Sequence, residues 1–141
     1  MSIIVKNLTH IYNEGMPFSS KALDDVSFEI KDKDFVGLIG HTGSGKSTFI
    51  QHLNGLIKVG KDKGNLYVGD YDLTDKKCDF KSLRSKVGMV FQYPEYQLFA
   101  ETVELDVAFA LKNFYPKMTE TEKVNAVRQA LSVVGLDYDK I

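Results

Sequence analysis

The stretch that decides the fold is GLIGHTGSGKSTFIQHLNGL, Gly37 to Leu56. Its beginning overlaps a continuous apolar run, Phe35 to Ile39, and the apolar residues after Lys46 recur at helical spacing. The order predicts a central strand over 35–39, covered on both faces, followed by a loop and then by a helix over 46–56. The glycine-rich loop between strand and helix is where we expect the chemistry.

The loop matches the phosphate-binding pattern G-x-x-x-x-G-K-[ST] at every fixed position from Gly40 to Ser47. Glycines let the backbone curl so that N–H groups converge on phosphate oxygens, and the helix N-terminus adds its positive dipole end. Lys46 can reach the β- and γ-phosphates, and the Ser47 hydroxyl can ligate Mg²⁺. The predicted nucleotide-binding residues of the loop are His41, Thr42, Gly43, Ser44, Gly45, Lys46, Ser47 and Thr48.

Composition favours one globular core in a chain of 141 residues with 43% hydrophobic and 26% charged residues. Eighteen basic and 19 acidic residues leave a net charge of -1, so no global field favours nucleic acid, and we predict no nucleic-acid partner. Cys78 is the only cysteine, which fits a reducing, cytosolic compartment, and we interpret it as an incidental thiol. No apolar run approaches the ~20 residues that span a bilayer, and the start has no signal-peptide pattern.

The remaining elements follow from periodicity and turn residues. Thr119 and Glu122 make a capping box for a last helix, and Gly135 is its expected stop, so SVVGLD (Ser132 to Asp137) is interpreted as a helix end. The other predicted elements are strands over 3–11 and 26–30, a hairpin over 66–73 that turns at Gly69-Asp70, a short helix over 81–86, a buried strand over 87–91 and a helix over 102–113.

GTPases and small nucleotide kinases also carry this phosphate-loop pattern. A GTPase needs an N-K-x-D guanine reader, and none of the asparagines begins one. Small nucleotide kinases usually open on the phosphate loop, whereas here about forty residues of strand material precede it. A P-loop kinase, or another soluble nucleotide-binding protein, stays open as the alternative at this point.

Three segments resemble the ATP-binding subunit of ABC transporters. They are Tyr12 followed by ALDDVSFEI (Ala22 to Ile30), LIGHTGSGKST in the loop, and VFQYPEYQLF (Val90 to Phe99). The runs QHLNGL, ETV and DVAFALKNF are similar to one branch, the energy-coupling factor (ECF) or cobalt-type ATPases of vitamin and metal-ion importers. The resemblance covers Ile3 to Leu136 and implies an α/β P-loop core of the ABC ATPase type, with an antiparallel β group ahead of it.

The resemblance implies further site residues. Tyr12 would stack on the adenine ring, and Gln92 would sense the γ-phosphate as a catalytic residue together with Lys46, ligating Mg²⁺ together with Ser47. Each could instead be an ordinary surface residue. The segment that would meet a transmembrane subunit comprises Tyr93, Pro94, Tyr96, Leu98 and Phe99, although Leu98 and Phe99 could alternatively be core residues.

The implied cofactors are ATP and Mg²⁺. The implied partners are a second ABC-type ATPase subunit, the same or different, an integral membrane transporter subunit and a substrate-binding membrane component. The implied location is cytoplasmic, peripheral at the inner face of the cell membrane.

The sequence lacks several motifs of the family, and their absence predicts what this chain can do. The sequence reaches Ile141 before the L-S-G-G-Q signature, the Walker B aspartate, the catalytic glutamate and the switch histidine that the family carries. We therefore expect residues 1–141 to be a single, truncated N-terminal part of an ABC-type ATP-binding domain. The full-length protein would be a transport-coupled ATPase, and this chain would hydrolyse ATP very poorly. Lys33-Asp34 stands where relatives usually have Gly-Glu, which carries a cost if the turn needs a positive φ.

Overall fold

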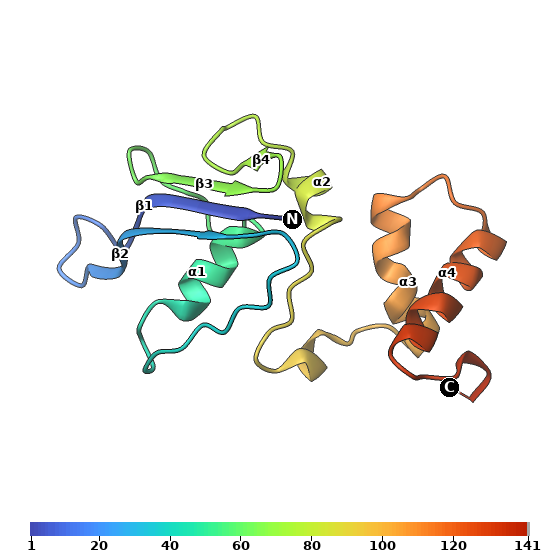
Figure 1. Cartoon of the computed structure of the whole chain (residues 1–141). Helices are drawn as coiled ribbons and strands as arrows, with labels where there is room; N and C mark the ends of the chain where they lie inside the picture. Colours follow the sequence, from blue (N-terminus) through green and yellow to red (C-terminus); the bar gives the residue numbers. More distant parts are fainter. Residues whose placement is uncertain (141) are drawn as a thin grey trace. The chain divides into compact units, whose positions relative to one another are not determined.

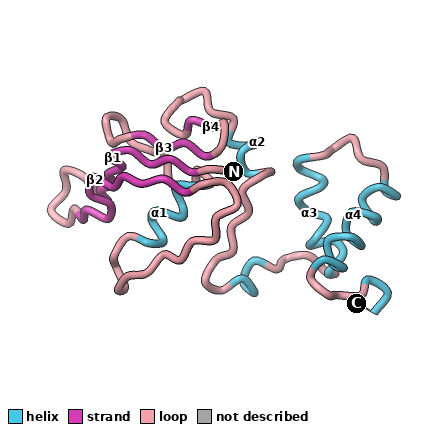
Figure 2. Tube along the Cα trace, viewed as in Figure 1, coloured by secondary structure: helices cyan, strands magenta, loops and turns pink. Residues whose placement is uncertain are grey.

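The computed structural model describes residues 1–140. The chain divides into two compact units, Met1–Gly88 and Met89–Ile141. Figure 1 traces both units, and Figure 2 shows strands in the first unit and helices joined by loops in the second.

The first unit is built on a four-stranded sheet with the order β2-β1-β3-β4. All neighbouring strands are antiparallel: Val5 of β1 pairs with Phe28 of β2 on one side and with Leu66 of β3 on the other. Val68 pairs with Tyr71 across the turn at 69–70, as the sequence predicts. The strands are β1 (Ile3–Tyr12), β2 (Ser20–Ile30), β3 (Asn65–Val68) and β4 (Tyr71–Asp72).

Helix α1 (Lys46–Leu53) packs on one face of this sheet (Figure 1). Its buried face carries Phe49 and His52, and the short helix α2 (Phe80–Arg84) adds Leu83. The apolar core that these elements share contains Val5, Leu8, Leu23, Phe49, Leu66, Val68, Leu73 and Leu83. The alternation of apolar residues in β1 and β3 therefore buries one face of the sheet under the helix that follows the phosphate loop.

Arg84 holds the far end of α1 in place. Its guanidinium donates hydrogen bonds from Nε to the carbonyl of Asn54 at 3.1 Å and from a terminal nitrogen to the carbonyl of Gly55 at 3.0 Å. Carbonyls at a helix C-terminus have no partner within the helix, and a cation there also complements the helix dipole. The phosphate-loop helix is thus fixed at its C-terminal end by a side chain from α2.

Two predicted strands, over 35–39 and 87–91, are wrong: the structure has irregular chain in both places. Phe35 is fully exposed, Ile39 is 96% exposed and Val90 is 82% exposed. A central strand needs partners on both edges for its N–H and C=O groups. Within residues 1–140 no segment forms a ladder with either run, so apolar composition alone does not make them strands.

The second unit is helical. Its elements are the 3₁₀ turns η1 (Pro94–Gln97) and η2 (Tyr138–Lys140) and the helices α3 (Val103–Phe114) and α4 (Glu120–Val133). Ala108 of α3 packs against Val127 and Leu131 of α4.

The predicted ends of α4 are confirmed. Thr119 accepts from the backbone N–H of Glu122, and the Glu122 carboxylate accepts from the N–H of Thr119 at 2.7 Å. At the other end Gly135 has φ +78°, and the N–H of Leu136 donates to the carbonyl of Leu131 at 2.9 Å, so the helix ends in a Schellman motif.

Candidate functional site

The phosphate loop is bent by two glycines with left-handed backbone. Gly43 has φ +83° and Gly45 has φ +87°. A Cβ on Gly45 would lie 2.2 Å from the carbonyl oxygen of Ala22 in β2, whereas a Cβ on Gly43 would meet nothing within 4 Å. Gly45 is therefore required for close approach to the sheet as well as for its φ, and β2 supports the loop from behind.

Lys46 closes the loop. Its ammonium donates to the carbonyl of Gly40 at 2.6 Å and to that of His41 at 2.7 Å, and it lies 3.2 Å from the Ser44 hydroxyl. Lys46 is also the first residue of α1, where backbone N–H groups lack partners and the helix dipole is positive. The loop thus gathers a cation, a helix N-terminus and exposed backbone, which is the arrangement that captures a phosphate chain.

The predicted base-stacking tyrosine lies beside this loop. Tyr12 is the last residue of β1, and its hydroxyl lies 3.1 Å from the hydroxyl of Thr48, 36 residues further along the chain. Tyr12 is 40% exposed, so it is open in part to a stacking partner. Ser47, the predicted Mg²⁺ ligand, is exposed on the first turn of α1. The structure therefore brings the predicted base shelf, cation ligand and phosphate loop together.

The His41 side chain bonds within the loop. Its Nδ1 lies 2.8 Å from the carbonyl oxygen of Thr42, and since a carbonyl only accepts, Nδ1 is the donor. The His41 ring is thus engaged with the loop backbone, which leaves its own backbone N–H as the group that the loop pattern would use for phosphate.

Sequence reasoning missed two other histidines behind the site, His10 and His52. The ring of His10 lies 4.5 Å from that of Tyr12 and 4.9 Å from that of His52. His52 is 1% exposed, and its Nδ1 bonds the carbonyl of Thr48 at 2.7 Å. A sequence signal did exist, because His10 precedes Tyr12 by two positions on a strand and His52 follows Thr48 by one helical turn.

The remaining predicted residues belong to the second unit. The Gln92 amide faces the Tyr93 hydroxyl at 3.5 Å. Leu98 is 69% exposed and Phe99 is 66% exposed, so neither is a core residue, and Pro94 and Tyr96 are exposed as well. The five residues Tyr93, Pro94, Tyr96, Leu98 and Phe99 therefore form an exposed aromatic segment on the surface of this unit. The two units are not placed relative to one another, so the structure fixes no distance between Gln92 and the phosphate loop.

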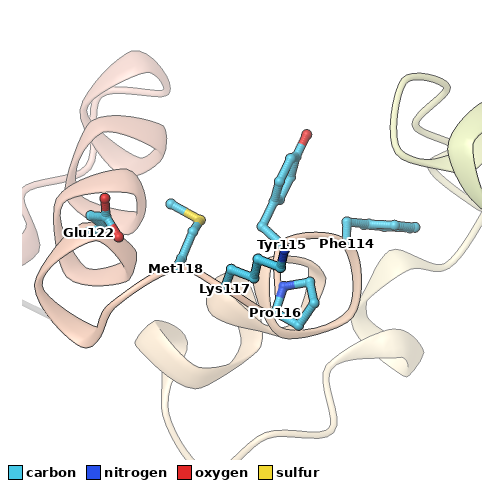
Figure 3. Close-up of a pocket in the computed structure, with 6 residues that line it drawn as sticks. All are labelled: Phe114, Tyr115, Pro116, Lys117, Met118 and Glu122. Atoms are coloured by element: carbon cyan, nitrogen blue, oxygen red, sulfur yellow. The ribbon is translucent and has the colours of Figure 1, made fainter.

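A separate pocket of about 390 Å³ lies at the junction of α3 and α4. Figure 3 shows the side chains of Tyr115 and Met118 rising from the loop that joins the two helices. None of the predicted site residues lines this pocket. Its lining consists of Phe114, Tyr115, Pro116, Lys117, Met118 and Glu122.

The structure also bears on metal and thiol chemistry. In residues 1–140 no group of three or more His, Cys, Asp or Glu side chains is arranged to hold a metal ion. Within the same range no helix is both long enough and apolar enough to cross a bilayer.

Burial and the nearby carboxylates of Asp72, Asp75 and Asp79 raise the pKa of the Cys78 thiol, which keeps it protonated and poorly reactive.

Comparison with known proteins gives matches along almost the whole chain. Residues 23–141 match the family model described as ABC transporter. The chain is 63% identical over 139 residues to the energy-coupling factor transporter ATP-binding protein EcfA2 of Clostridioides difficile and 52% identical over 140 residues to that of Clostridium tetani. Each match covers 99% of this chain and 47% of the relative, so the chain spans about half the length of the curated relatives it matches.

Two solved structures illustrate the similarity in fold. MJ0796, determined as a dimer in a post-hydrolysis state bound to ADP and Pi, is 29% identical with a TM-score of 0.79, covering 97% of this chain and 59% of that one. CbiO1 of Clostridium perfringens, described as part of the ABC transporter complex cbiONQ, is 30% identical with a TM-score of 0.77, covering 96% of this chain and 51% of that one. The fold is therefore that of an ABC ATPase, present in part.

Proposed function

Because this chain belongs to the ABC transporter family, we propose that residues 1–141 form the N-terminal part of one ATP-binding domain whose phosphate loop holds ATP. The observation that carries the proposal is the contact between Tyr12 and Thr48. This contact supports the proposal because the Tyr12 ring lies beside the loop that Lys46 closes, where a base and its phosphates would be bound together.

Mg²⁺ is proposed as the partner of the nucleotide. The exposed hydroxyl of Ser47, on the first turn of α1, is a hard oxygen ligand of the kind that Mg²⁺ takes, and Gln92 offers an amide oxygen. A cation bound by so few side chains relies on phosphate oxygens and water for its other ligands. When bound, the ion neutralises charge on the β- and γ-phosphates.

The role proposed for the whole protein is the ATP-binding subunit of an ECF-type importer for cobalt or vitamins. The names of its relatives in Clostridioides difficile and Clostridium tetani support this branch, as does the description of CbiO1. The partners would be a second ATP-binding subunit, as in the dimeric cassette MJ0796, and integral membrane subunits at the inner face of the cell membrane. Transport-coupled hydrolysis would belong to the full-length protein, and these 141 residues would hydrolyse ATP very poorly.

The proposed contact with the membrane subunit is the exposed aromatic segment, Tyr93, Pro94, Tyr96, Leu98 and Phe99. Exposed tyrosine and apolar side chains gathered in seven residues are typical of a protein interface.

The first experiment measures binding of ATP and GTP to the 141-residue chain, with and without Mg²⁺. Lys46→Ala should abolish measurable binding, because the loop loses its only cationic side chain. Tyr12→Ala should weaken ATP binding about 5- to 150-fold, the range that corresponds to a base–aromatic stack of ~1–3 kcal/mol. GTP should bind in the same range as ATP, because stacking discriminates little between bases.

Two variants control these measurements. Lys61→Ala removes an exposed lysine from the same unit and should leave binding unchanged. Tyr12→Phe keeps the ring but removes the hydroxyl that contacts Thr48, and it should lose much less than Tyr12→Ala. Undiminished binding by Lys46→Ala would contradict the proposed site.

A further inference from the structure

Two histidines, the partly buried His10 and the buried His52, connect the base shelf to the phosphate-loop helix. The rings of Tyr12, His10 and His52 stand edge to face in a row, with centroids 4.5 Å and 4.9 Å apart. Thr48 contacts both ends of this row, because its hydroxyl lies 3.1 Å from that of Tyr12 and its carbonyl oxygen 2.7 Å from Nδ1 of His52. The four residues therefore form a closed circuit of contacts that joins the end of β1 to the two turns of α1.

The hydrogen bond to Thr48 fixes the tautomer of His52 in its neutral state. The Thr48 carbonyl can only accept, so Nδ1 of His52 carries a hydrogen, and in the neutral imidazole Nε2 is the bare nitrogen. Among residues 1–140, Nε2 of His52 and Nε2 of His10 are both buried without a hydrogen-bond partner. A second proton on either ring would create a buried charge with no acceptor, which is strongly unfavourable.

Burial is the main influence on the titration of both imidazoles. Burial lowers the pKa of both imidazoles; at His52 the hydrogen bond to Thr48 opposes this effect and the charge of His10 adds to it.

On the elements beside His10, charged side chains form ion pairs with one another, and the Asp25 carboxylate of β2 accepts a hydrogen bond from the Asn7 amide. Across the sheet His10 lies opposite the apolar Leu23 of β2. Lys21 and Asp24 of β2 form an exposed pair with each other. The neighbouring backbone N–H of Thr9 donates to the carbonyl of Lys63, whose ammonium is paired with Glu14.

The strand is adapted to this arrangement. The register between β1 and β2 shifts on both sides of His10, between Leu8 and His10 and between His10 and Ile11. Such irregularities re-aim a side chain relative to a regular strand. They occur where β1 passes helix α1. The positions of the His10 and Tyr12 rings therefore depend on these register shifts.

We propose that His10 and His52 are positioning residues of the nucleotide site: while both imidazoles are neutral they hold Tyr12 against Thr48, and protonation of either one releases the base shelf and weakens ATP binding. The inference rests on the proposed function, because it assigns pH regulation to the same site. It goes beyond that function because it predicts that acidification below about pH 6.5 lowers the affinity of the site for ATP.

The direct test is an NMR titration of the three histidine rings of the 141-residue chain, with and without saturating ATP and Mg²⁺. Linkage is reciprocal, so if ATP binds the neutral form better, ATP must lower the pKa of His10 and His52 further. A tenfold preference for the neutral form corresponds to about one pH unit. Unchanged titration midpoints at His10 and His52 in the presence of bound ATP overturn the inference.

The third histidine separates the two possible failures. His41 lies in the phosphate loop, so its ring signals should move when ATP binds, whatever His10 and His52 do. If the His41 signals move and the other midpoints stay, ATP binds and only the inference is wrong. If no histidine signal changes, ATP does not bind, and the proposed function fails together with the inference.

A pair of substitutions gives an independent readout. The double variant His10→Phe, His52→Phe keeps two aromatic rings in the row and removes both titrating groups. If ATP lowers a histidine pKa by about one unit, the unmodified chain should lose up to about tenfold more ATP affinity than the double variant as the pH falls from about 8 through the histidine titration. Ionisation of ATP itself is common to both proteins, so only the difference between the profiles is interpreted. Parallel profiles overturn the inference, and if the double variant does not fold, the titration of the unmodified chain decides alone.

Discussion

At the residue scale, Lys33 and His52 each carry an unfavourable local interaction that the fold tolerates. Lys33 adopts φ +67°, in the left-handed region where a Cβ is strained. His52 is an almost fully buried imidazole whose Nε2 has no partner within the described residues. Each effect arises from one side chain. A substitution at Lys33 or at His52 should therefore change the free energy of unfolding in the way that the local interaction predicts.

Lys33→Gly is expected to stabilise the protein. Release of the left-handed strain of about 1–2 kcal/mol is offset in part by the greater freedom of glycine in the unfolded chain, which leaves a gain of about 0.5–1 kcal/mol. The measurement is the free energy of unfolding in urea. Lys33→Ala is the matched control, because alanine removes the same charge but keeps the Cβ, and a gain equal to that of glycine would contradict the strain account.

Stability should fall as the pH drops below 6.5, the ordinary pKa of histidine, toward the lower pKa values of folded His10 and His52. In this window the unfolded chain binds more protons than the folded one, so the free energy of unfolding rises with pH and its full value is present above 6.5. Urea unfolding across this range measures the slope. His52→Phe should show a shallower slope, and a slope as steep as that of the unmodified chain would contradict the assignment.

At the scale of elements, local signals define the helices and long-range pairing defines the strands. Thr102 and Thr119 cap α3 and α4 from positions directly before them, and Gly135 ends α4 in a left-handed conformation. The run at 35–39 has the composition of a strand, yet it makes no ladder within the described chain. A helix satisfies its backbone internally, whereas a strand depends on a neighbour.

Thr119→Ala should destabilise α4 by about 1 kcal/mol, because the backbone N–H of Glu122 loses its hydrogen-bond acceptor at the helix start. Thr121→Ala, two positions further in the same helix and also exposed, should not destabilise the helix, because alanine has the higher helix propensity by a few tenths of a kcal/mol. Thermal unfolding followed by circular dichroism compares the two variants. Equal losses in both would show that the capping box does not stabilise the helix.

The reciprocal half of the capping box makes α4 sensitive to acid. The backbone and side-chain hydrogen bonds from Thr119 lower the pKa of Glu122, which remains a carboxylate acceptor until the pH falls well into the acid range.

At the scale of the whole molecule, large apolar side chains reach the surface in both units. Phe35 and Ile39 precede the phosphate loop, and Leu98 and Phe99 lie in the exposed aromatic segment. Soluble proteins rarely leave contiguous apolar surface open unless a partner covers it.

The 141-residue chain should therefore associate with itself as its concentration rises. Phe35→Ser combined with Ile39→Ser should lower the average mass measured by light scattering, because it removes two exposed apolar residues of one run. Phe18→Ser is the control: it removes a single exposed aromatic residue from the loop between β1 and β2, and its effect should be smaller. A monodisperse monomer at every concentration would contradict this expectation.

The sequence by itself determined the phosphate loop, the helix that begins at Lys46, the hairpin turn at 69–70 and both ends of α4. Each of these depends on residues within a few positions of one another, where backbone preference and local hydrogen bonds decide the conformation. The candidate phosphate site was predictable for the same reason.

Only the tertiary structure decided that Tyr12 meets Thr48, that His10 and His52 stand behind the site, and that the run at 35–39 stays exposed. Tyr12 and Thr48 are 36 residues apart, and their contact depends on how β1 and α1 pack. The strand prediction at 35–39 went wrong because apolar composition reports a tendency to be buried, while burial in a sheet requires partners that composition cannot supply.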